Sequence, residues 1–314
     1  MQGSGVKPGV VVNGRAGRVA RHPALIALLR QQLPRENVYV TRDPSEVAPA
    51  LEILHEVGID TLVIVGGDGS VTGTLTPLLQ VWPNESLPRV LLAGGGSVNT
   101  IAKSLGVRGR PDRVLARLLA GSRPPREDPR PLLRIRAEGA EPVLGMIFAN
   151  GGGPRWLEFY YKHSDRGVRG AVYSVAASLG SAVVGGELAR EVFEPFEAEL
   201  ELDGQRQQPG RFTAMAAGSV RHIGLGFAPF TSAGRKPGHF HFLTMDFSGW
   251  GFLRRIPGLR LGTRSALAAL GHASSQRVVV RTEQPVPYTV DAELFPGVKR
   301  VTIEAGPELR FMIV

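Results

Sequence analysis

The chain of 314 residues contains no cysteine, which excludes disulfide bonds, thiolate metal sites and a cysteine nucleophile. It also lacks an apolar run of the roughly 20 residues that a membrane-spanning helix needs. The longest such run, residues 171–184, is short and rich in serine and glycine. The first ten residues, MQGSGVKPGV, hold no apolar core of signal-peptide length. We therefore expect a cytosolic protein.

Several common site motifs are missing as well. There is no G-x-x-x-x-G-K-[ST] sequence, and Thr72 stands where G-x-G-x-x-G would need a third glycine after Gly67 and Gly69. No G-x-S-x-G sequence indicates a hydrolase nucleophile. His239 and His241 alternate along a predicted strand, but no third ligand is spaced to join them, so a surface or packing role is favoured.

Acidic residues are fewer than basic ones. The chain has 28 Asp and Glu against 37 Lys and Arg, a formal net charge of +9 and a pI near 10.4. This balance favours an anionic partner, which could be a nucleotide, a nucleic acid or an acidic lipid surface. We expect no nucleic acid, because neither RNP-like aromatic residues nor a helix-turn-helix pattern accompanies the charge.

Residues 247–261, FSGWGFLRRIPGLRL, combine aromatic and apolar residues with arginines. This composition is typical of a segment that lies at a membrane interface and contacts anionic headgroups. A core helix with two exposed arginines is the alternative. The sequence leaves both interpretations open.

The first part of the chain alternates short apolar runs with helical patterns, which predicts a parallel α/β sheet. We expect a helix over residues 45–57 to begin behind Ser45 as its N-cap. The proline-rich segment SRPPREDPRP, residues 122–131, should form a linker without regular structure. The other predicted strands cover residues 10–12, 38–40, 62–65 and 90–93, and the other predicted helices cover residues 22–32 and 111–121.

The second part is rich in strand patterns, so we expect a mainly antiparallel β domain. We predict an α/β domain with a parallel sheet over residues 1–130 and a β-rich domain over residues 131–314, whose last strands return to the cleft between the domains. The predicted strands cover residues 132–137, 143–149, 196–202, 211–217, 239–245, 278–281, 298–304 and 309–313, and the predicted helices cover residues 171–184 and 251–270.

Glycines follow two of the predicted parallel strands. Gly66 and Gly67 end one strand, and residues 94–96 are three glycines that end the next. Because glycine has no Cβ, such loops bring bare backbone amides against a bulky anion. Each loop then opens a helix, whose N-terminus favours negative charge. We expect these loops and residues 13–17 to converge on one crevice that binds a polyphosphate.

These motifs resemble a known family. GGDGS at residues 66–70, GGGSVNTIAKSLGV at 94–107, NGRAG at 13–17 and YTVDAELF at 288–295 are similar to the motifs of the diacylglycerol kinase catalytic domain superfamily. That superfamily includes bacterial lipid kinases, sphingosine kinases and ceramide kinases, with NAD kinases as distant relatives. The resemblance extends over essentially the whole chain.

The resemblance implies a cytoplasmic, ATP- and Mg²⁺-dependent kinase that acts on a lipid hydroxyl at the inner membrane surface. It assigns Asp68 to the phosphate and metal side and Glu293 to the role of base, with Asp291 supporting the metal or the geometry. Asp291 and Glu293 lie two apart on a presumed strand, so we expect them to share a face. The implied nucleotide-binding residues are Asn13, Gly14, Gly17, Gly66, Gly67, Gly69, Ser70, Gly95, Gly96, Ser97 and Asn99.

The sequence departs from the family pattern at several positions. Gly73 replaces a frequent glutamate, and Ala292 replaces the glycine of D-G-E, which matters if that position has a positive φ. Residues 236–238, Lys-Pro-Gly, stand where relatives carry a structural Mg²⁺ site, so we expect that site to be absent. Two alternatives therefore stay open, an NAD kinase and a non-catalytic nucleotide- or lipid-binding protein. A homodimer is compatible with the sequence.

Overall fold

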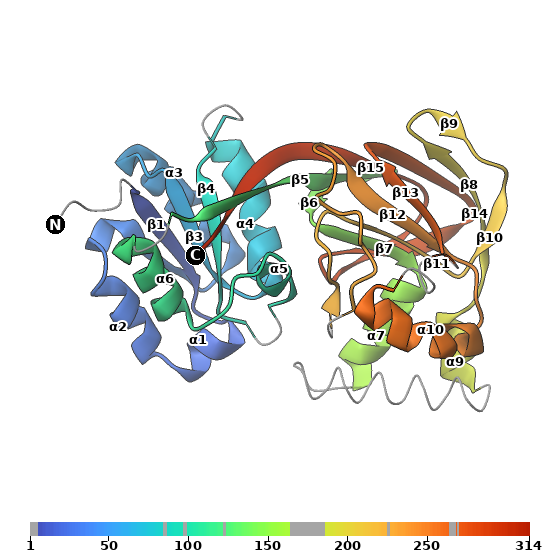
Figure 1. Cartoon of the computed structure of the whole chain (residues 1–314), viewed down its shortest axis with the longest axis horizontal. Coiled ribbons are helices and arrows are strands. Elements are labelled where there is room, and N and C mark those ends of the chain that lie inside the picture. The colour runs from blue at the N-terminus through green and yellow to red at the C-terminus, as the bar shows by residue number, and fades with distance from the viewer. Residues whose placement is uncertain are drawn as a thin grey trace. The chain divides into compact units, whose positions relative to one another are not determined.

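The computed structural model describes residues 6–83, 87–96, 99–121, 124–163, 186–224, 227–263, 268 and 270–314 (Figure 1). The chain divides into two compact units. Unit 1 comprises Met1–Arg130 and Pro307–Val314, and unit 2 comprises Pro131–Gly306.

The sheet of unit 1 has the strand order β2-β1-β3-β4, and all neighbours in it are parallel. The end of the long strand β15 (Glu293–Ile313) lies beside β4 and is parallel to it, with Phe311 opposite Val90. The predicted parallel α/β sheet is confirmed. Its strands are β1 (Pro8–Asn13), β2 (Val38–Thr41), β3 (Thr61–Gly66) and β4 (Arg89–Gly94).

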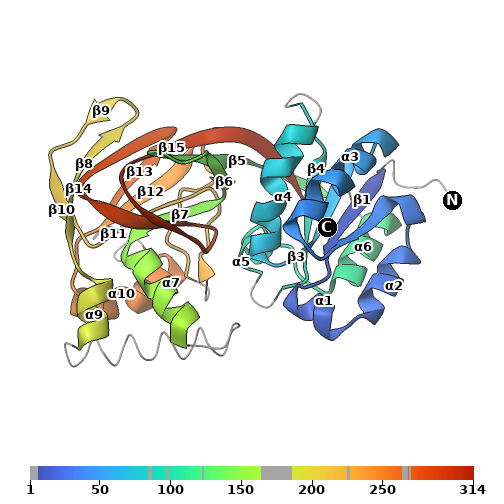
Figure 2. The ribbon, with the colours of Figure 1, turned by 180° about the vertical axis from the view of Figure 1, so that it is seen from behind.

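Helices pack on the sheet of unit 1. Leucines of α2 and α6 join strand valines in one buried cluster, whereas α3 and α4 pack against each other (Figure 2). The central residues of β1, β3 and β4 are continuously apolar and buried, as in a sheet that is covered on both faces. The helices are α1 (Gly17–Arg21), α2 (Ala24–Arg30), α3 (Val47–Val57), α4 (Asp68–Val81), α5 (Thr100–Ser104) and α6 (Pro111–Ala120).

The predicted N-cap of the helix over residues 45–57 is wrong. Asp43 is the capping residue, and its carboxylate accepts a hydrogen bond of 3.0 Å from the Ser45 amide. A short 3₁₀ turn, Pro44–Glu46, precedes α3. The helical segment begins at Pro44, one residue earlier than expected, because proline has the φ angle and the missing donor that suit a first helical position.

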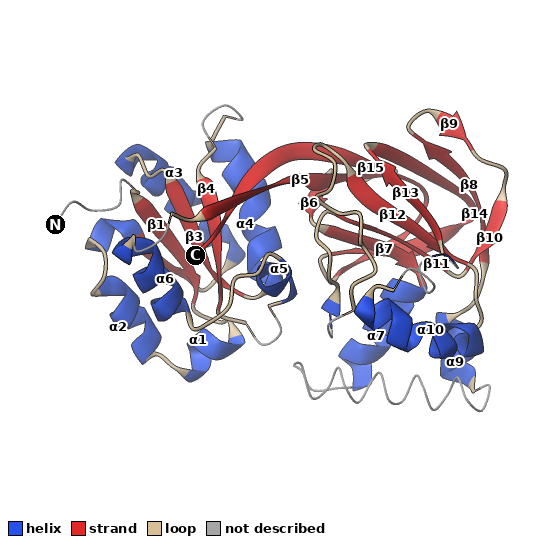
Figure 3. Cartoon of the chain, in the orientation of Figure 1, coloured by secondary structure: helices blue, strands red, loops and turns tan. Residues whose placement is uncertain are grey.

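Unit 2 is built mainly of antiparallel strands, with its three described helices on one side (Figure 3). Its described helices are α7 (Gly152–His163), α9 (Glu187–Val192) and α10 (Gly249–Leu261). The strands other than β15 are β5 (Arg126–Ala137), which begins in unit 1, β6 (Val143–Gly145), β7 (Ile147–Gly151), β8 (Phe196–Leu202), β9 (Gln205–Arg206), β10 (Gly210–Phe212), β11 (Ala214–Gly218), β12 (Phe240–Met245), β13 (Gly271–Ser275) and β14 (Arg277–Val290).

Two predictions about the β-rich part need correction. The expected linker over residues 122–131 is wrong from Arg126 onward, because β5 includes Pro129 and Pro131. Proline removes one ladder donor, but its fixed φ is compatible with an extended strand. The two strands predicted over residues 298–304 and 309–313 belong to one continuous strand, β15.

The predicted helix over residues 171–184 lies outside the described residues. The helix predicted over residues 251–270 corresponds to α10, which ends at Leu261. Among the described residues, no helix is long and apolar enough to cross a membrane.

Candidate functional site

The polar and glycine-rich loops of unit 1 lie at one edge of its sheet. Strands β1, β3 and β4 are parallel neighbours, so Asn13, Gly66 and Gly94 at their carboxyl ends meet there. The Asn13 side-chain amide donates a hydrogen bond of 2.8 Å to the Ser70 hydroxyl. This bond joins the first loop, residues 13–17, to the loop that follows β3. The predicted convergence of these loops is confirmed.

The loops after β3 and β4 touch through bare backbone. A Cβ on Gly96 would lie 2.4 Å from the Cα of Gly67, so no side chain fits there. The amides of Gly95 and Gly96 donate to the Gly66 carbonyl at 2.8 and 3.1 Å. A Cβ on Gly66 would clash with Ser70 as well. Glycine is therefore required at Gly96 because the two backbones approach so closely, and at Gly66 because the Ser70 side chain leaves no room for a Cβ.

Asn99 stabilises the loop that follows β4 through hydrogen bonds within that loop. Its side chain is buried and forms two hydrogen bonds of 2.8 Å with Gly96, accepting from the amide and donating to the carbonyl. Its φ of 55° lies in the left-handed region, which asparagine tolerates better than most residues. Ser97, the other polar residue predicted in this loop, lies outside the described residues.

Asp68 connects the two glycine loops. It is the first residue of α4, and its two carboxylate oxygens accept hydrogen bonds of 2.9 Å from the amides of Thr100 and Ile101. These amides belong to the first turn of α5 and have no partner within that helix. A carboxylate offers about four lone-pair sites, so its oxygens retain sites that can face a ligand. Asp68 thus bonds to the other loop rather than only to its own turn.

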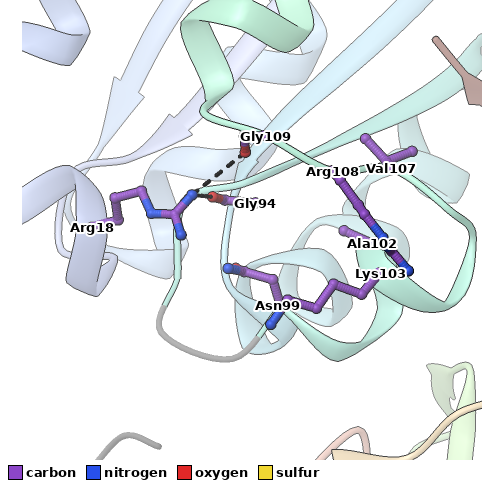
Figure 4. Close-up of a pocket in the computed structure, with 8 residues that line it drawn as sticks. All are labelled: Arg18, Gly94, Asn99, Ala102, Lys103, Val107, Arg108 and Gly109. Carbon is purple, nitrogen blue, oxygen red and sulfur yellow. Dashed lines mark hydrogen bonds between the residues drawn. The ribbon is translucent and has the colours of Figure 1, made fainter. Parts of the chain in front are cut away.

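A cavity of about 360 Å³ lies beside the loop that follows β4 (Figure 4). The guanidinium of Arg18 donates to the carbonyls of Gly94 and Gly109 at 3.2 and 3.4 Å. With Lys103 and Arg108, Arg18 gives the cavity three cationic side chains, and none of the lining residues is acidic. The lining residues are Arg18, Gly94, Asn99, Ala102, Lys103, Val107, Arg108 and Gly109.

These three cations were not among the site residues predicted from the sequence. Arg18 directly follows the first loop, and Lys103 lies inside the quoted motif GGGSVNTIAK, so both stood next to a recognised signal. Basic residues are common in this chain, and only the folded loops show which of them border the cavity.

Asp291 and Glu293 lie in unit 2, and the expectation that they share a strand face is wrong. Strand β14 ends at Val290 and β15 begins at Glu293, with Asp291 and Ala292 forming the turn between them. Their φ angles of 47° and 74° make a two-residue reversal of the type I′ kind. The turn separates the two acidic side chains because it reverses the chain direction.

The two acidic residues have different surroundings. The Asp291 carboxylate is 6% exposed and accepts amide hydrogen bonds from Met146, at 3.0 Å to its nearer oxygen, and from Ile147, at 2.8 Å. Glu293 is exposed to solvent. The Tyr161 hydroxyl of α7 donates a 2.8 Å hydrogen bond to the Ala292 carbonyl and so holds the turn from the other side. The arrangement leaves Glu293 available to a ligand, whereas Asp291 fixes the turn.

The alternating histidines are buried in unit 2, in agreement with a packing role. Burial is the main cause that lowers the pKa of His241 to about 4, and the neighbouring His272 and Arg235 contribute less. The Nδ1 atom of His239 lies 2.8 Å from the Pro237 carbonyl oxygen. In the part of the chain that the structure describes, no three His, Asp or Glu side chains are grouped to hold a metal ion.

The parallel sheet of unit 1 defines an α/β domain, and two glycine loops are in backbone contact at its carboxyl edge. Residues 7–125 match the model of the diacylglycerol kinase catalytic domain. This segment is therefore similar to that domain, and the resemblance inferred from the motifs at residues 13–17, 66–70 and 94–107 is confirmed.

Curated relatives and solved structures extend this comparison. The chain is 26% identical over 113 residues to proteins named "Probable lipid kinase YegS" from Escherichia fergusonii and Shigella flexneri. The match covers 36% of this chain and 38% of the length of those relatives.

The fold is similar to that of a diacylglycerol kinase from Bacillus anthracis str. Sterne, with a TM-score of 0.66 and 14% identity over 100% of this chain and 98% of that one. A further structure from the same organism gives a TM-score of 0.69 and 14% identity, and covers 100% of this chain and 97% of that one. At 14% identity these structures show the fold alone.

Proposed function

We propose that the chain is an ATP-dependent lipid kinase that transfers the γ-phosphoryl group to a hydroxyl of a diacylglycerol-, sphingoid- or ceramide-like lipid. The observation that carries this proposal is the backbone contact between Gly67 and Gly96. It keeps side chains away from an edge where two helices begin, so that backbone amides can approach a polyphosphate. The similarity of residues 7–125 to the diacylglycerol kinase catalytic domain supports the same activity.

Phosphoryl transfer requires positioning and charge neutralisation more than covalent chemistry from the protein. In the proposed site the two glycine loops bind the phosphates, and Asn13, Ser70 and Asn99 hold the loops in shape. Arg18, Lys103 and Arg108 add positive charge beside the loop after β4. This charge would offset part of the negative charge of ATP.

Asp68 fits a Mg²⁺ ion carried by the nucleotide. Mg²⁺ in such sites is bound by one or two carboxylates together with substrate phosphates and water. Asp68 retains lone pairs beyond its two amide contacts, whereas the buried Asp291 already accepts amides on both oxygens and fits a direct metal contact poorly. When bound, the ion supplies neutralisation of phosphate charge.

Glu293 is the proposed base. A carboxylate that accepts the proton of the attacking hydroxyl must be reachable by substrate, and Glu293 is exposed at the start of β15. Asp291 holds the preceding turn through the amides of Met146 and Ile147. We therefore assign Asp291 a positioning role and Glu293 the contact with the acceptor.

A transfer assay with ATP labelled in the γ-phosphate tests the proposal. The acceptors are detergent-dispersed diacylglycerol, sphingosine and ceramide, with NAD as the soluble alternative. Label in a lipid, lost in Glu293→Gln and kept in the matched exposed control Glu283→Gln, is the expected result. Label in NAD would replace the proposal by an NAD kinase. ATP binding without transfer to any acceptor would leave a non-catalytic nucleotide-binding protein.

A further inference from the structure

Helix α10 exposes a row of side chains that combines apolar residues with arginines. Trp250, Arg254, Pro257 and Leu261 are all exposed and recur at positions i, i+4, i+7 and i+11, so they lie along one face. The side chain of Trp250 is 51% exposed and that of Leu261 72%. At a rise of about 1.5 Å per residue the row is about 16 Å long. We call these four residues and the neighbouring Arg260 the α10 stripe.

The opposite face of α10 is fixed to unit 2. Leu259 is buried in a cluster with Phe230, Leu243, Phe247 and Leu270. Phe252 lies on the same buried face, packs against this cluster and contacts Phe193 beside α9. Figures 1 and 2 show α7, α9 and α10 on the same side of the unit 2 sheet. The segment therefore combines the two roles that its sequence left open, a packed core face and an exposed stripe.

Both ends of the helix are anchored. The Ser248 hydroxyl accepts a hydrogen bond of 3.3 Å from the Gly251 amide, and the Ala228 amide donates to the Leu259 carbonyl at 3.1 Å. Gly262 ends the helix with a φ of 66°. The α10 stripe is thus presented on a preorganised surface, which reduces the ordering cost when it binds a partner.

The charges of the α10 stripe are uncompensated. In the described part of the chain, neither Arg254 nor Arg260 lies within 4.0 Å of a carboxylate in an ion pair, and α10 itself contains no acidic residue. Arg255 differs, because it stacks on the Phe247 ring at 4.5 Å and donates to the Gly251 carbonyl. A partner that suits the stripe must offer anions and an apolar layer together.

We propose that the α10 stripe docks this chain onto the surface of an anionic lipid bilayer. Trp250 and Leu261 insert at the boundary between headgroups and acyl chains, and Arg254 and Arg260 bind lipid phosphates. A second copy of the chain fits less well, because its stripe carries the same charges and the chain has a net charge of +9. The proposal deepens the proposed function, since a lipid kinase finds its acceptor in a membrane.

Co-sedimentation with vesicles tests the docking without any kinase step. Vesicles that contain phosphatidylserine or phosphatidylglycerol should bind the wild-type chain, and binding should fall as salt rises. The double variant Arg254→Glu with Arg260→Glu should bind at least about 25-fold more weakly, because each basic residue near the surface contributes roughly a factor of five. The matched control Arg113→Glu with Arg206→Glu makes the same charge change at exposed positions elsewhere and should bind almost like the wild type.

Fluorescence reports which face binds. Trp250 is the most exposed of the three tryptophans, so anionic vesicles should shift its emission to the blue and brominated lipids should quench it. Trp250→Phe should remove both effects. Equal binding of the two double variants would overturn the proposal, and so would concentration-dependent dimerisation that protects Trp250 without vesicles.

The outcome is separable from that of the kinase assay. A chain that binds vesicles but transfers no phosphate would keep the docking surface and refute the activity. The opposite result would keep the activity and refute the docking surface. In that case the wild type and Arg254→Glu with Arg260→Glu would transfer phosphate equally to detergent-dispersed lipid, and neither would bind vesicles.

Discussion

The Asp68 carboxylate accepts a hydrogen bond of 2.9 Å from the Ile101 amide and so ties the start of α4 to the start of α5. Its other oxygen accepts the Thr100 amide at the same distance. Asp68, at the end of the loop after β3, thereby sets the position of α5, the helix that follows the loop after β4. The same side chain is proposed to face the phosphates, so its loss should affect folding and binding together.

We predict that Asp68→Ala lowers the free energy of unfolding by about 1–2 kcal/mol, since two helix-terminal amides lose their acceptor. ATP binding should weaken as well. Asp68→Asn keeps one oxygen acceptor and should restore most of the stability without restoring phosphoryl transfer. Denaturant titration and calorimetric ATP binding measure the two effects. Asp43→Ala, a cap at a distant turn, is the control and should cost stability alone. Wild-type transfer rates in Asp68→Asn would contradict the role of its charge.

The contact between the glycine loops gives a second prediction. Gly96→Ala places a Cβ 2.4 Å from the Gly67 Cα, so the loops must separate. We expect ATP affinity to fall at least tenfold, about 1.4 kcal/mol or more, because the two loops that are proposed to bind the phosphates move apart. Isothermal titration calorimetry measures the change.

Gly73→Ala is the matched control for that variant. Gly73 lies in α4, and a Cβ there meets nothing within 4 Å. The substitution should raise stability by roughly 0.5–1 kcal/mol through helix propensity and leave ATP affinity unchanged. If Gly96→Ala bound ATP like the wild type, the loops would not be the phosphate site.

The sequence was informative where local signals suffice. Apolar runs that end in glycine identified β3 and β4 and the edge where they meet, because buried parallel strands are continuously apolar. The same runs could not show that Asp68 bonds amides 32 and 33 residues away, since nothing in a local window encodes that contact. The three cations of the cavity were missed for the same reason.

Other errors came from general rules that tertiary contacts override. Prolines in residues 122–131 predicted irregular structure, yet β5 accommodates Pro129 and Pro131. Asp291 and Glu293 were assigned to one strand because their spacing fits a period of two, whereas buried amides of Met146 and Ile147 hold Asp291 in a turn. A residue with positive φ is hard to predict when it is not glycine or asparagine.

Ala292 provides a third prediction. Its φ of 74° lies in the left-handed region, which costs an L-residue about 1–2 kcal/mol and glycine much less. Ala292→Gly should therefore raise the free energy of unfolding by about 1 kcal/mol. Denaturant titration measures it, with Ala116→Gly in the exposed part of α6 as a control that should be destabilising by a similar amount. A loss of stability in Ala292→Gly would contradict the turn geometry.

His241 provides the last prediction, a pH dependence. His241 is 1% exposed. Its Nδ1 atom accepts a hydrogen bond of 3.4 Å from the Ser232 amide, and its Nε2 atom has no partner among the described residues. Burial lowers the pKa of His241 from 6.5 to about 4, assisted by the positive charges that His272 and Arg235 can bring near it. The unfolded chain therefore binds a proton at His241 below about pH 6.5, whereas the folded chain resists it. Stability contributed by the neutral ring is complete above pH 6.5 and is lost as pH falls towards 4.

Over that interval the wild type should lose about 3 kcal/mol through this one group. His241→Leu should unfold with a flatter dependence between pH 6.5 and 4, because the group that titrates is gone, even if its stability at pH 8 is lower. His272→Gln should reduce the loss partly by removing one neighbouring positive charge. The exposed His22→Gln is the control and should follow the wild-type curve. Denaturant titrations at each pH measure the slopes, and parallel curves for the wild type and His241→Leu would show that the ring of His241 titrates normally in the folded chain.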